Sequence, residues 1–166
     1  MKIDKFVIDG MKCGYSGPFS VSDFFKKVET WMHEKGKETE LKSKREEVTE
    51  DSKNIEWTVE FWQDASEWSR IVIRIRALFK DVRDVKVKVG KAKKVMQKGN
   101  AIILIDGILE TDVDDKWANK PTMQFMRTIL DKFVYRFHMN KLEDRISKEA
   151  YETHDMITDF FSKCHQ

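Results

Sequence analysis

Residues 55–79 read IEWTVEFWQDASEWSRIVIRIRALF, and this stretch decides the fold of the chain. Its two arms, 55–62 and 71–79, alternate large apolar side chains with mostly polar or charged ones. A period of two is typical of a β-strand that buries one face and exposes the other. Residues 63–68 separate the arms, so the stretch predicts two antiparallel strands joined by a loop.

The apolar side chains also limit how the two arms can pair. The inward-facing residues are the odd-numbered ones in both arms, so the numbers of two paired residues must add to an even number. For a turn centred at residue 65 or 66, the sum of two paired residue numbers is 130 or 132. Arg74 then lies opposite Glu56 or Thr58. In either register Arg74 and Arg76 lie on the outer face beside glutamates, so we expect ion pairs there.

Upstream of this hairpin, the sequence predicts a strand at residues 3–9 and a glycine-rich loop at residues 10–18. A helix follows, because Ser20 can cap it and Asp23 stands where a capping box places an acid. Phe19 and Phe24 have the spacing of a hydrophobic staple around that cap. Gly36 is a natural end for this helix.

Further strands are expected on either side of the hairpin. The almost wholly polar residues 38–50 favour an exposed edge strand. Alternating valines predict a strand at residues 85–89, and Gly99-Asn100 reads as a turn. The apolar run 101–110 predicts a strand that is covered on both faces.

The C-terminal third is expected to be helical. A wide apolar stripe from Met123 to Phe137 predicts a long helix that begins near Pro121, and Ser147 can cap an additional last helix. The predicted fold class is α+β: a curved antiparallel sheet of five to six strands is wrapped on a long C-terminal helix, and an extra C-terminal helix follows. Residues 1–166 form a single domain, with a core at 1–140 and a helical extension at 141–166.

Composition and motifs exclude several classes of protein. The chain has 166 residues, of which 40% are hydrophobic and 36% are charged, and it contains no apolar run long enough for a membrane span. Two cysteines and no signal-peptide pattern favour a reducing, cytoplasmic location. The metal-ligand spacings and glycine-rich nucleotide loops are absent, so we expect no metal and no cofactor.

The order of predicted elements resembles the helix-grip architecture of the START-like superfamily, which includes polyketide cyclases, pathogenesis-related plant proteins and steroid-transfer domains. The resemblance covers residues 1–140, and it implies a bent sheet around the long helix with a cavity between them. Two features depart from it: one helix, rather than two, follows the first strand, and the last helix has no counterpart. The chain also resembles a set of archaeal proteins through Phe6-Val7-Ile8-Asp9-Gly10, Gly17-Pro18-Phe19-Ser20-Val21 and Ala77-Leu78-Phe79. Neither resemblance carries a catalytic residue.

The leading functional hypothesis is a protein that binds an apolar or amphipathic small molecule between the sheet and the C-terminal helix. Ligand pockets are mostly apolar with a few polar groups that converge on them. The predicted lining residues are Trp57, Phe61, Ile73, Ile75, Phe79, Met126, Leu130, Phe133 and Phe137, with Tyr15, Arg74, Arg76 and His138 as candidate polar contacts. A closed core built from the same apolar residues is the alternative that the sequence leaves open.

Two other functions are carried as alternatives. Residues 70–98 contain 11 basic and 2 acidic side chains, a net charge of +9, whereas both flanks are acidic. This basic segment could bind a nucleic acid or another anionic partner. The second alternative is a homodimer through an outer face that carries Trp62, Val72 and Leu78. Catalysis is not favoured, because no spacing supplies His138, His154 or Cys13 with a partner group.

Overall fold

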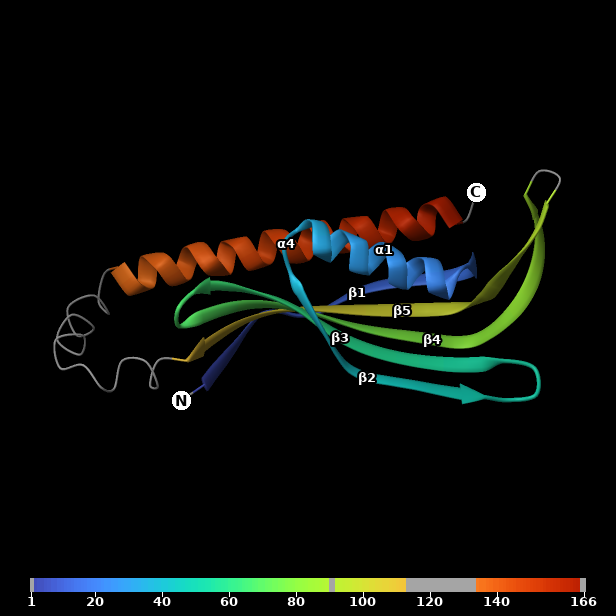
Figure 1. Ribbon diagram of the computed structural model, residues 1–166, viewed down its shortest axis with the longest axis horizontal. Coiled ribbons are helices and arrows are strands. Elements are labelled where there is room, and N and C mark those ends of the chain that lie inside the picture. Colours follow the sequence, from blue (N-terminus) through green and yellow to red (C-terminus); the bar gives the residue numbers. More distant parts are fainter. Residues whose placement is uncertain (1, 90–91, 113–133, 165–166) are drawn as a thin grey trace.

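A computed structural model of the chain describes residues 2–89, 92–112 and 134–164 (Figure 1). The described elements are β1 (Lys2–Phe19), α1 (Val21–Glu34), β2 (Glu38–Val48), β3 (Lys53–Ser66), β4 (Ser69–Val89), β5 (Ala92–Asp112) and α4 (Val134–Cys164). The five strands form one antiparallel sheet in the order β1-β5-β4-β3-β2. The α+β class and the antiparallel sheet are therefore confirmed, while a sixth strand is not found in the described part of the chain.

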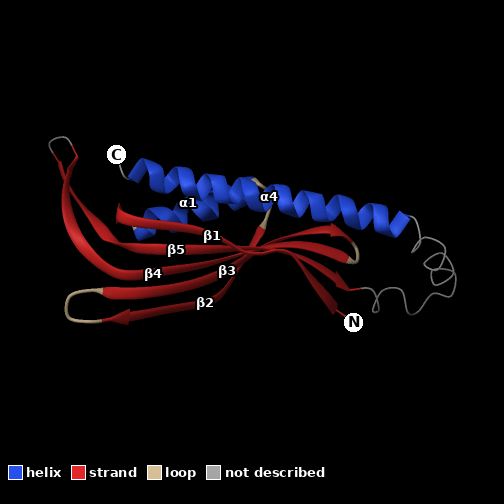
Figure 2. Ribbon diagram, turned by 180° about the vertical axis from the view of Figure 1, so that it is seen from behind, coloured by secondary structure: helices blue, strands red, loops and turns tan. Residues whose placement is uncertain are grey.

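Both described helices lie on the same face of the sheet, which we call the inner face (Figures 1 and 2). Helix α4 runs along β1 and β5, whereas α1 lies beside it. No described helix covers the opposite, outer face. The sheet bends, and the far end of the β4–β5 hairpin curves past the ends of the strands around it.

The inner face is built from the predicted alternation. Odd-numbered residues of β3 and β4 from Ile55 to Phe79 are buried, apart from those next to the turn. The aromatic side chains of α1 cover this face: Phe25 lies 4.5 Å from Trp57 and Phe24 lies 5.5 Å from Phe79, measured between ring centroids. Burial of such large side chains is the main favourable term in folding.

The predicted register of the β3–β4 hairpin is wrong, although the sum of two paired residue numbers is even as predicted. Ile55 pairs with Phe79 and Glu60 pairs with Arg74, so paired numbers add to 134 rather than to 130 or 132. The cause is the turn, because Ser66 pairs with Ser69 and leaves only two residues between the strands. An irregularity near residue 65 then restores the even register along the rest of the hairpin.

The predicted loop at residues 10–18 is also wrong, because β1 continues through it to Phe19. Gly10 adopts a φ of 71° and forms a bulge, at which two residues of β1 lie opposite one residue of β5. Its amide donates a hydrogen bond to Asp106 Oδ1 at 2.7 Å. The glycine therefore bends the strand where the sequence suggested that the strand ends.

The start and end of α1 agree with the sequence. Ser20 is the N-cap, and its Oγ accepts a hydrogen bond from the amide of Asp23 at 3.3 Å. Gly36 follows the helix with a φ of 77°, which glycine adopts without strain. The predicted edge strand is confirmed as β2, whose residues are all exposed. Charged side chains on such an edge discourage pairing with another chain.

The extra C-terminal helix is not shown. Residues 134–164 form one continuous helix, so Ser147 lies in its interior rather than at a cap. The predicted start near Pro121 and the stripe at 123–133 lie outside the described residues. Ile146 of α4 is fully buried and packs above Gly107 of β5.

Candidate anion-binding surface

The strand residues that were predicted to line a cavity lie on the inner face. Trp57, Phe61, Ile73, Ile75 and Phe79 are each at most 4% exposed and belong to the hydrophobic core. Phe79 is in contact with the rings of Phe19, Phe24 and Phe25. The predicted partners on the C-terminal helix cannot be compared: Met126, Leu130 and Phe133 lie outside the described residues, as do the side chains of Phe137 and His138.

Tyr15 lies apart from these residues, at the open edge where β1 meets α4. Its ring stacks on Phe161 with 4.7 Å between centroids, and its hydroxyl donates to the carbonyl oxygen of Pro18 at 2.7 Å. Burial, followed by the nearby Cys164 thiol, raises the pKa of the Tyr15 phenol above its usual value. A groove of about 520 Å³ runs along this edge, and it is lined by Cys13, Gly14, Tyr15, Ser16, Thr158, Phe161 and Ser162.

The arginines near the β3–β4 turn are paired with carboxylates on the outer face. Arg74 contacts Glu60 at 3.0 Å, which confirms the predicted type of partner. Arg76 contacts Asp106 of β5 at 3.0 Å instead of a glutamate of β3. Asp106 is almost completely buried, so Arg76 compensates a carboxylate that has lost most of its hydration.

Arg70 completes this set of neutralised arginines. It contacts Asp64 at 3.0 Å, and its guanidinium lies 3.9 Å from the ring centroid of Trp62. The structure describes six basic side chains of the segment 70–98, and three of them are therefore paired with carboxylates of the chain itself.

Val72 was predicted to lie on an outer dimer face together with Trp62, but it is only 2% exposed.

The remaining basic residues belong to the far part of the β4–β5 hairpin, residues 80–98, which we call the distal hairpin. It contains eight basic and two acidic residues, a net charge of +6. Lys80, Arg83 and Lys98 are exposed, and none of them forms an ion pair with a described carboxylate. Arg83 and Lys98 are direct cross-strand partners. Like charges in such a position repel each other and destabilise the pair of strands.

A bulge shapes the base of the distal hairpin. Asp81 has a φ of 55°, and the register shifts between Lys80 and Arg83, so two residues of β4 lie opposite Gly99 of β5. A Cβ on Gly99 would lie 3.0 Å from the carbonyl oxygen of Lys80 and from Cα of Val82, which explains the glycine. The predicted turn at Gly99-Asn100 is therefore wrong, because these residues continue β5 beneath the bulge.

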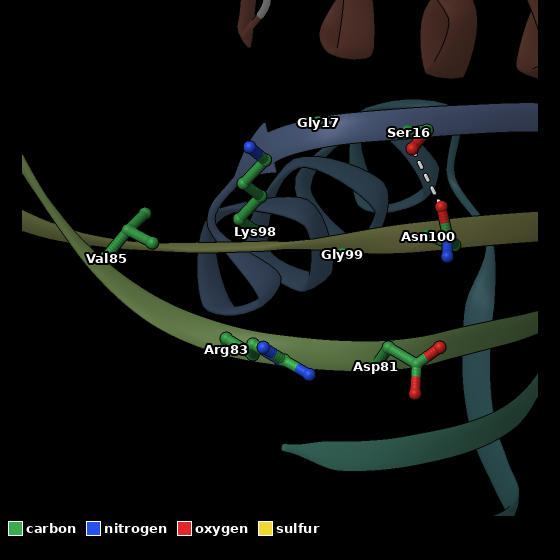
Figure 3. Close-up of a pocket in the computed structure, with 8 residues that line it drawn as sticks. All are labelled: Ser16, Gly17, Asp81, Arg83, Val85, Lys98, Gly99 and Asn100. Carbon is green, nitrogen blue, oxygen red and sulfur yellow. Dashed lines mark hydrogen bonds between the residues drawn. The ribbon is translucent and has the colours of Figure 1, made fainter. Parts of the chain in front are cut away.

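An open depression of about 320 Å³ lies on this part of the outer face (Figure 3). It is lined by Ser16 and Gly17 of β1, by Asp81, Arg83 and Val85 of β4, and by Lys98, Gly99 and Asn100 of β5. Ser16 Oγ donates to Asn100 Oδ1 at 2.7 Å, which joins β1 to β5. Cationic, hydroxyl, amide and carboxylate groups thus line one small hollow.

Sequence reasoning missed most of these residues. The charge of the segment 70–98 pointed to this surface, but residues 16 and 17 were assigned to a loop and residues 99 and 100 to a turn. The pairing of β4 with β5, which places Arg83 opposite Lys98, would have identified the surface. Predicting that pair requires knowledge of the bulge at Asp81, because the bulge shifts the register, and the sequence carries no local mark of the bulge.

Comparison with known proteins assigns the chain to no family. No protein-family model matches it, and no curated protein is similar enough to count as a relative. Among the described residues, no helix combines the length and apolar character needed to cross a bilayer. The described His, Cys, Asp and Glu side chains form no group of three that could hold a metal ion.

Proposed function

We propose that the protein binds the phosphate backbone of a nucleic acid through the distal hairpin. The observation that carries this proposal is the division of the basic segment. Arg70, Arg74 and Arg76 are paired with carboxylates, whereas Lys80, Arg83 and Lys98 are exposed and have no described carboxylate partner. Unpaired cations on one protruding element are the groups that release counterions from a polyanion.

The shape of the distal hairpin supports the same function. It is a two-stranded antiparallel ribbon that curves away from the body of the sheet (Figure 1). A β-ribbon of this kind fits into a groove of a duplex or follows a single strand. Contacts of lysine and arginine with phosphates position a protein on a nucleic acid but carry no sequence information. We therefore expect binding without strong sequence preference.

Fluorescence anisotropy with a labelled oligonucleotide tests the proposal. The hairpin variant, which combines Lys80→Gln, Arg83→Gln and Lys98→Gln, should bind at least about tenfold more weakly than the unmodified protein at low salt. All three positions are exposed, so the fold should not change.

A matched control separates a local effect from the loss of net charge. The control variant combines Lys26→Gln, Lys27→Gln and Lys163→Gln, which removes the same charge from exposed positions of α1 and α4. It should keep most of the affinity. Equal losses in the two variants would show that only the overall charge matters and would reject the distal hairpin as the binding element.

A second function, binding of a small apolar molecule, is favoured by the groove between β1 and α4. Tyr15 and Phe161 form an aromatic wall there, and the volume of about 520 Å³ lies within the usual range of ligand pockets, about 300–1,000 Å³. Thr158 is exposed on α4, one turn before Phe161, so Thr158→Trp should fill the groove. Loss of binding of a naphthalene-based fluorescent probe in this variant supports the function, and equal binding by both proteins contradicts it.

We also propose that the fold is a shortened helix-grip. Three features support this assignment. The strand β1 pairs with the last strand, β5, and the remaining strands follow β5 in the order β4, β3 and β2. The C-terminal helix lies along β1 and β5. An experimental structure in which the C-terminal helix leaves the inner face would contradict it.

A further inference from the structure

The depression at the base of the distal hairpin has the chemistry of a site for a single nucleotide unit. Arg83 and Lys98 are paired across the strands and repel each other. An anion held between them would replace this repulsion with two attractions. Arginine binds phosphate oxygens through two parallel hydrogen bonds, and the lysine ammonium adds a point charge. One phosphate group is therefore the natural occupant of this side of the hollow.

Polar groups on the neighbouring strands extend the site beyond a phosphate. Asn100 Oδ1 accepts the hydroxyl hydrogen of Ser16, so the amide nitrogen of Asn100 is left as a hydrogen-bond donor. Gly17 and Gly99 also line the hollow, and a Cβ on Gly99 would lie 3.0 Å from the backbone of the bulge in β4. The volume of about 320 Å³ leaves room for the group that carries the phosphate.

Asp81 gives the site a means of selection. Its carboxylate lines the same hollow as Arg83, but the two form no ion pair. A carboxylate repels a second phosphate and accepts a hydrogen bond from a hydroxyl group. In dinucleotide-binding folds a carboxylate does this with a ribose hydroxyl. The same chemistry is available here, because the carboxylate borders an open hollow that Arg83 and Lys98 also line (Figure 3).

We infer that this depression binds one ribonucleotide unit of an RNA strand, with the phosphate on Arg83 and Lys98 and the ribose 2′-hydroxyl on Asp81. This inference rests on the proposed binding of nucleic acid and adds a preference for RNA over DNA. The 2′-hydroxyl is the group by which a protein distinguishes the two polymers. No other described residue is required for the preference.

The test compares RNA and DNA oligonucleotides of the same sequence, bound to the unmodified protein and to Asp81→Gly. Glycine adopts the positive φ of residue 81 without strain, so this variant keeps the bulge and removes the hydrogen-bond acceptor. The unmodified protein should prefer RNA by a fewfold to about tenfold, as expected for one hydrogen bond to a hydroxyl group. Asp81→Gly should weaken RNA binding relative to DNA binding and bring this ratio close to one.

A second measurement uses small molecules, which separates the site from the polymer. Ribose 5-phosphate should shift the backbone amide signals of Ser16, Gly17, Gly99 and Asn100 in NMR spectra more strongly than inorganic phosphate or deoxyribose 5-phosphate does. Equal affinity of the unmodified protein for RNA and DNA overturns the inference while leaving the proposed function intact. Absence of binding to either polymer overturns the proposed function itself.

Discussion

Replacement of Gly107 by alanine probes the contact between the sheet and α4. An ideal Cβ at this position would lie 2.6 Å from Cγ2 of Ile146 and 3.4 Å from Cβ of Ile8. Real Cβ atoms do not approach other atoms to less than 3.0 Å, so α4 or Ile146 has to move. Ile146 is fully buried and cannot turn towards solvent. Overpacking of this kind costs about 1–3 kcal/mol of unfolding free energy.

Urea unfolding followed by far-UV circular dichroism measures this cost. The matched control is Gly14→Ala, since Gly14 lies on β1, is exposed and has no atom within 4 Å of its ideal Cβ. The control should remain within about 0.5 kcal/mol of the unmodified protein. Because Ile146→Ala removes the clashing methyl group, Gly107→Ala should cost less in that background by about 0.5–3 kcal/mol. The reasoning is refuted if Gly107→Ala is as stable as the control, which is the result expected of a loosely filled layer.

Three further predictions concern other parts of the fold. Ser20→Ala removes the N-cap of α1 and should lower the unfolding free energy by about 1 kcal/mol in urea, whereas no change would mean that the cap is dispensable. Lys37 Nζ lies 2.7 Å from Glu149 and its side chain is 1% exposed, so Lys37→Met should cost about 2–3 kcal/mol; a loss below 0.5 kcal/mol would contradict the buried pair. The folded-state pKa of the Tyr15 phenol is raised, so the neutral phenol contributes to the free energy of unfolding. This contribution is complete below the unfolded pKa near 10 and is lost as pH rises through the folded-state pKa. Thermal unfolding should therefore show a smaller alkaline loss of stability for Tyr15→Phe than for the unmodified protein, and equal losses would disprove the link to Tyr15.

The sequence predicted the elements whose signal is local. The alternation from Ile55 to Phe79 identified two strands and their buried faces, because the period of a strand depends only on its own residues. The register of that hairpin depended on the turn at Glu67 and Trp68, whose length the sequence does not state. The observed sum of two paired residue numbers is 134, which exceeds the larger predicted sum by two. Every residue therefore has a different cross-strand partner, but it stays on the predicted face of the sheet.

Glycine was the least reliable signal. Gly10 and Gly99 were interpreted as a loop and a turn, yet each lies at a bulge within a long strand. A residue without a side chain permits a turn, a bulge and a close backbone approach alike. The choice between them is made by the partner strand, and no local pattern reveals it.

The candidate surface could be predicted only in part from the sequence, because it depends on local charge and on contacts between strands. The charge of residues 70–98 can be counted from the sequence, but the sequence does not tell which cations are already paired. Arg76 finds its carboxylate on Asp106, 30 positions away and on another strand, while Arg83 meets Lys98. The charge count therefore identified a basic segment, and the contacts between strands then distinguished its paired arginines from its unpaired cations among the described side chains.

The salt dependence of oligonucleotide binding tests the central claim most directly. Each phosphate contact contributes about 0.7–0.9 to the slope of log affinity against log salt concentration. The hairpin variant, which lacks the cations at positions 80, 83 and 98, should therefore have a slope shallower by about 2–3 than that of the unmodified protein. Identical slopes for the two proteins, or an affinity of the unmodified protein that does not change with salt, would contradict the account.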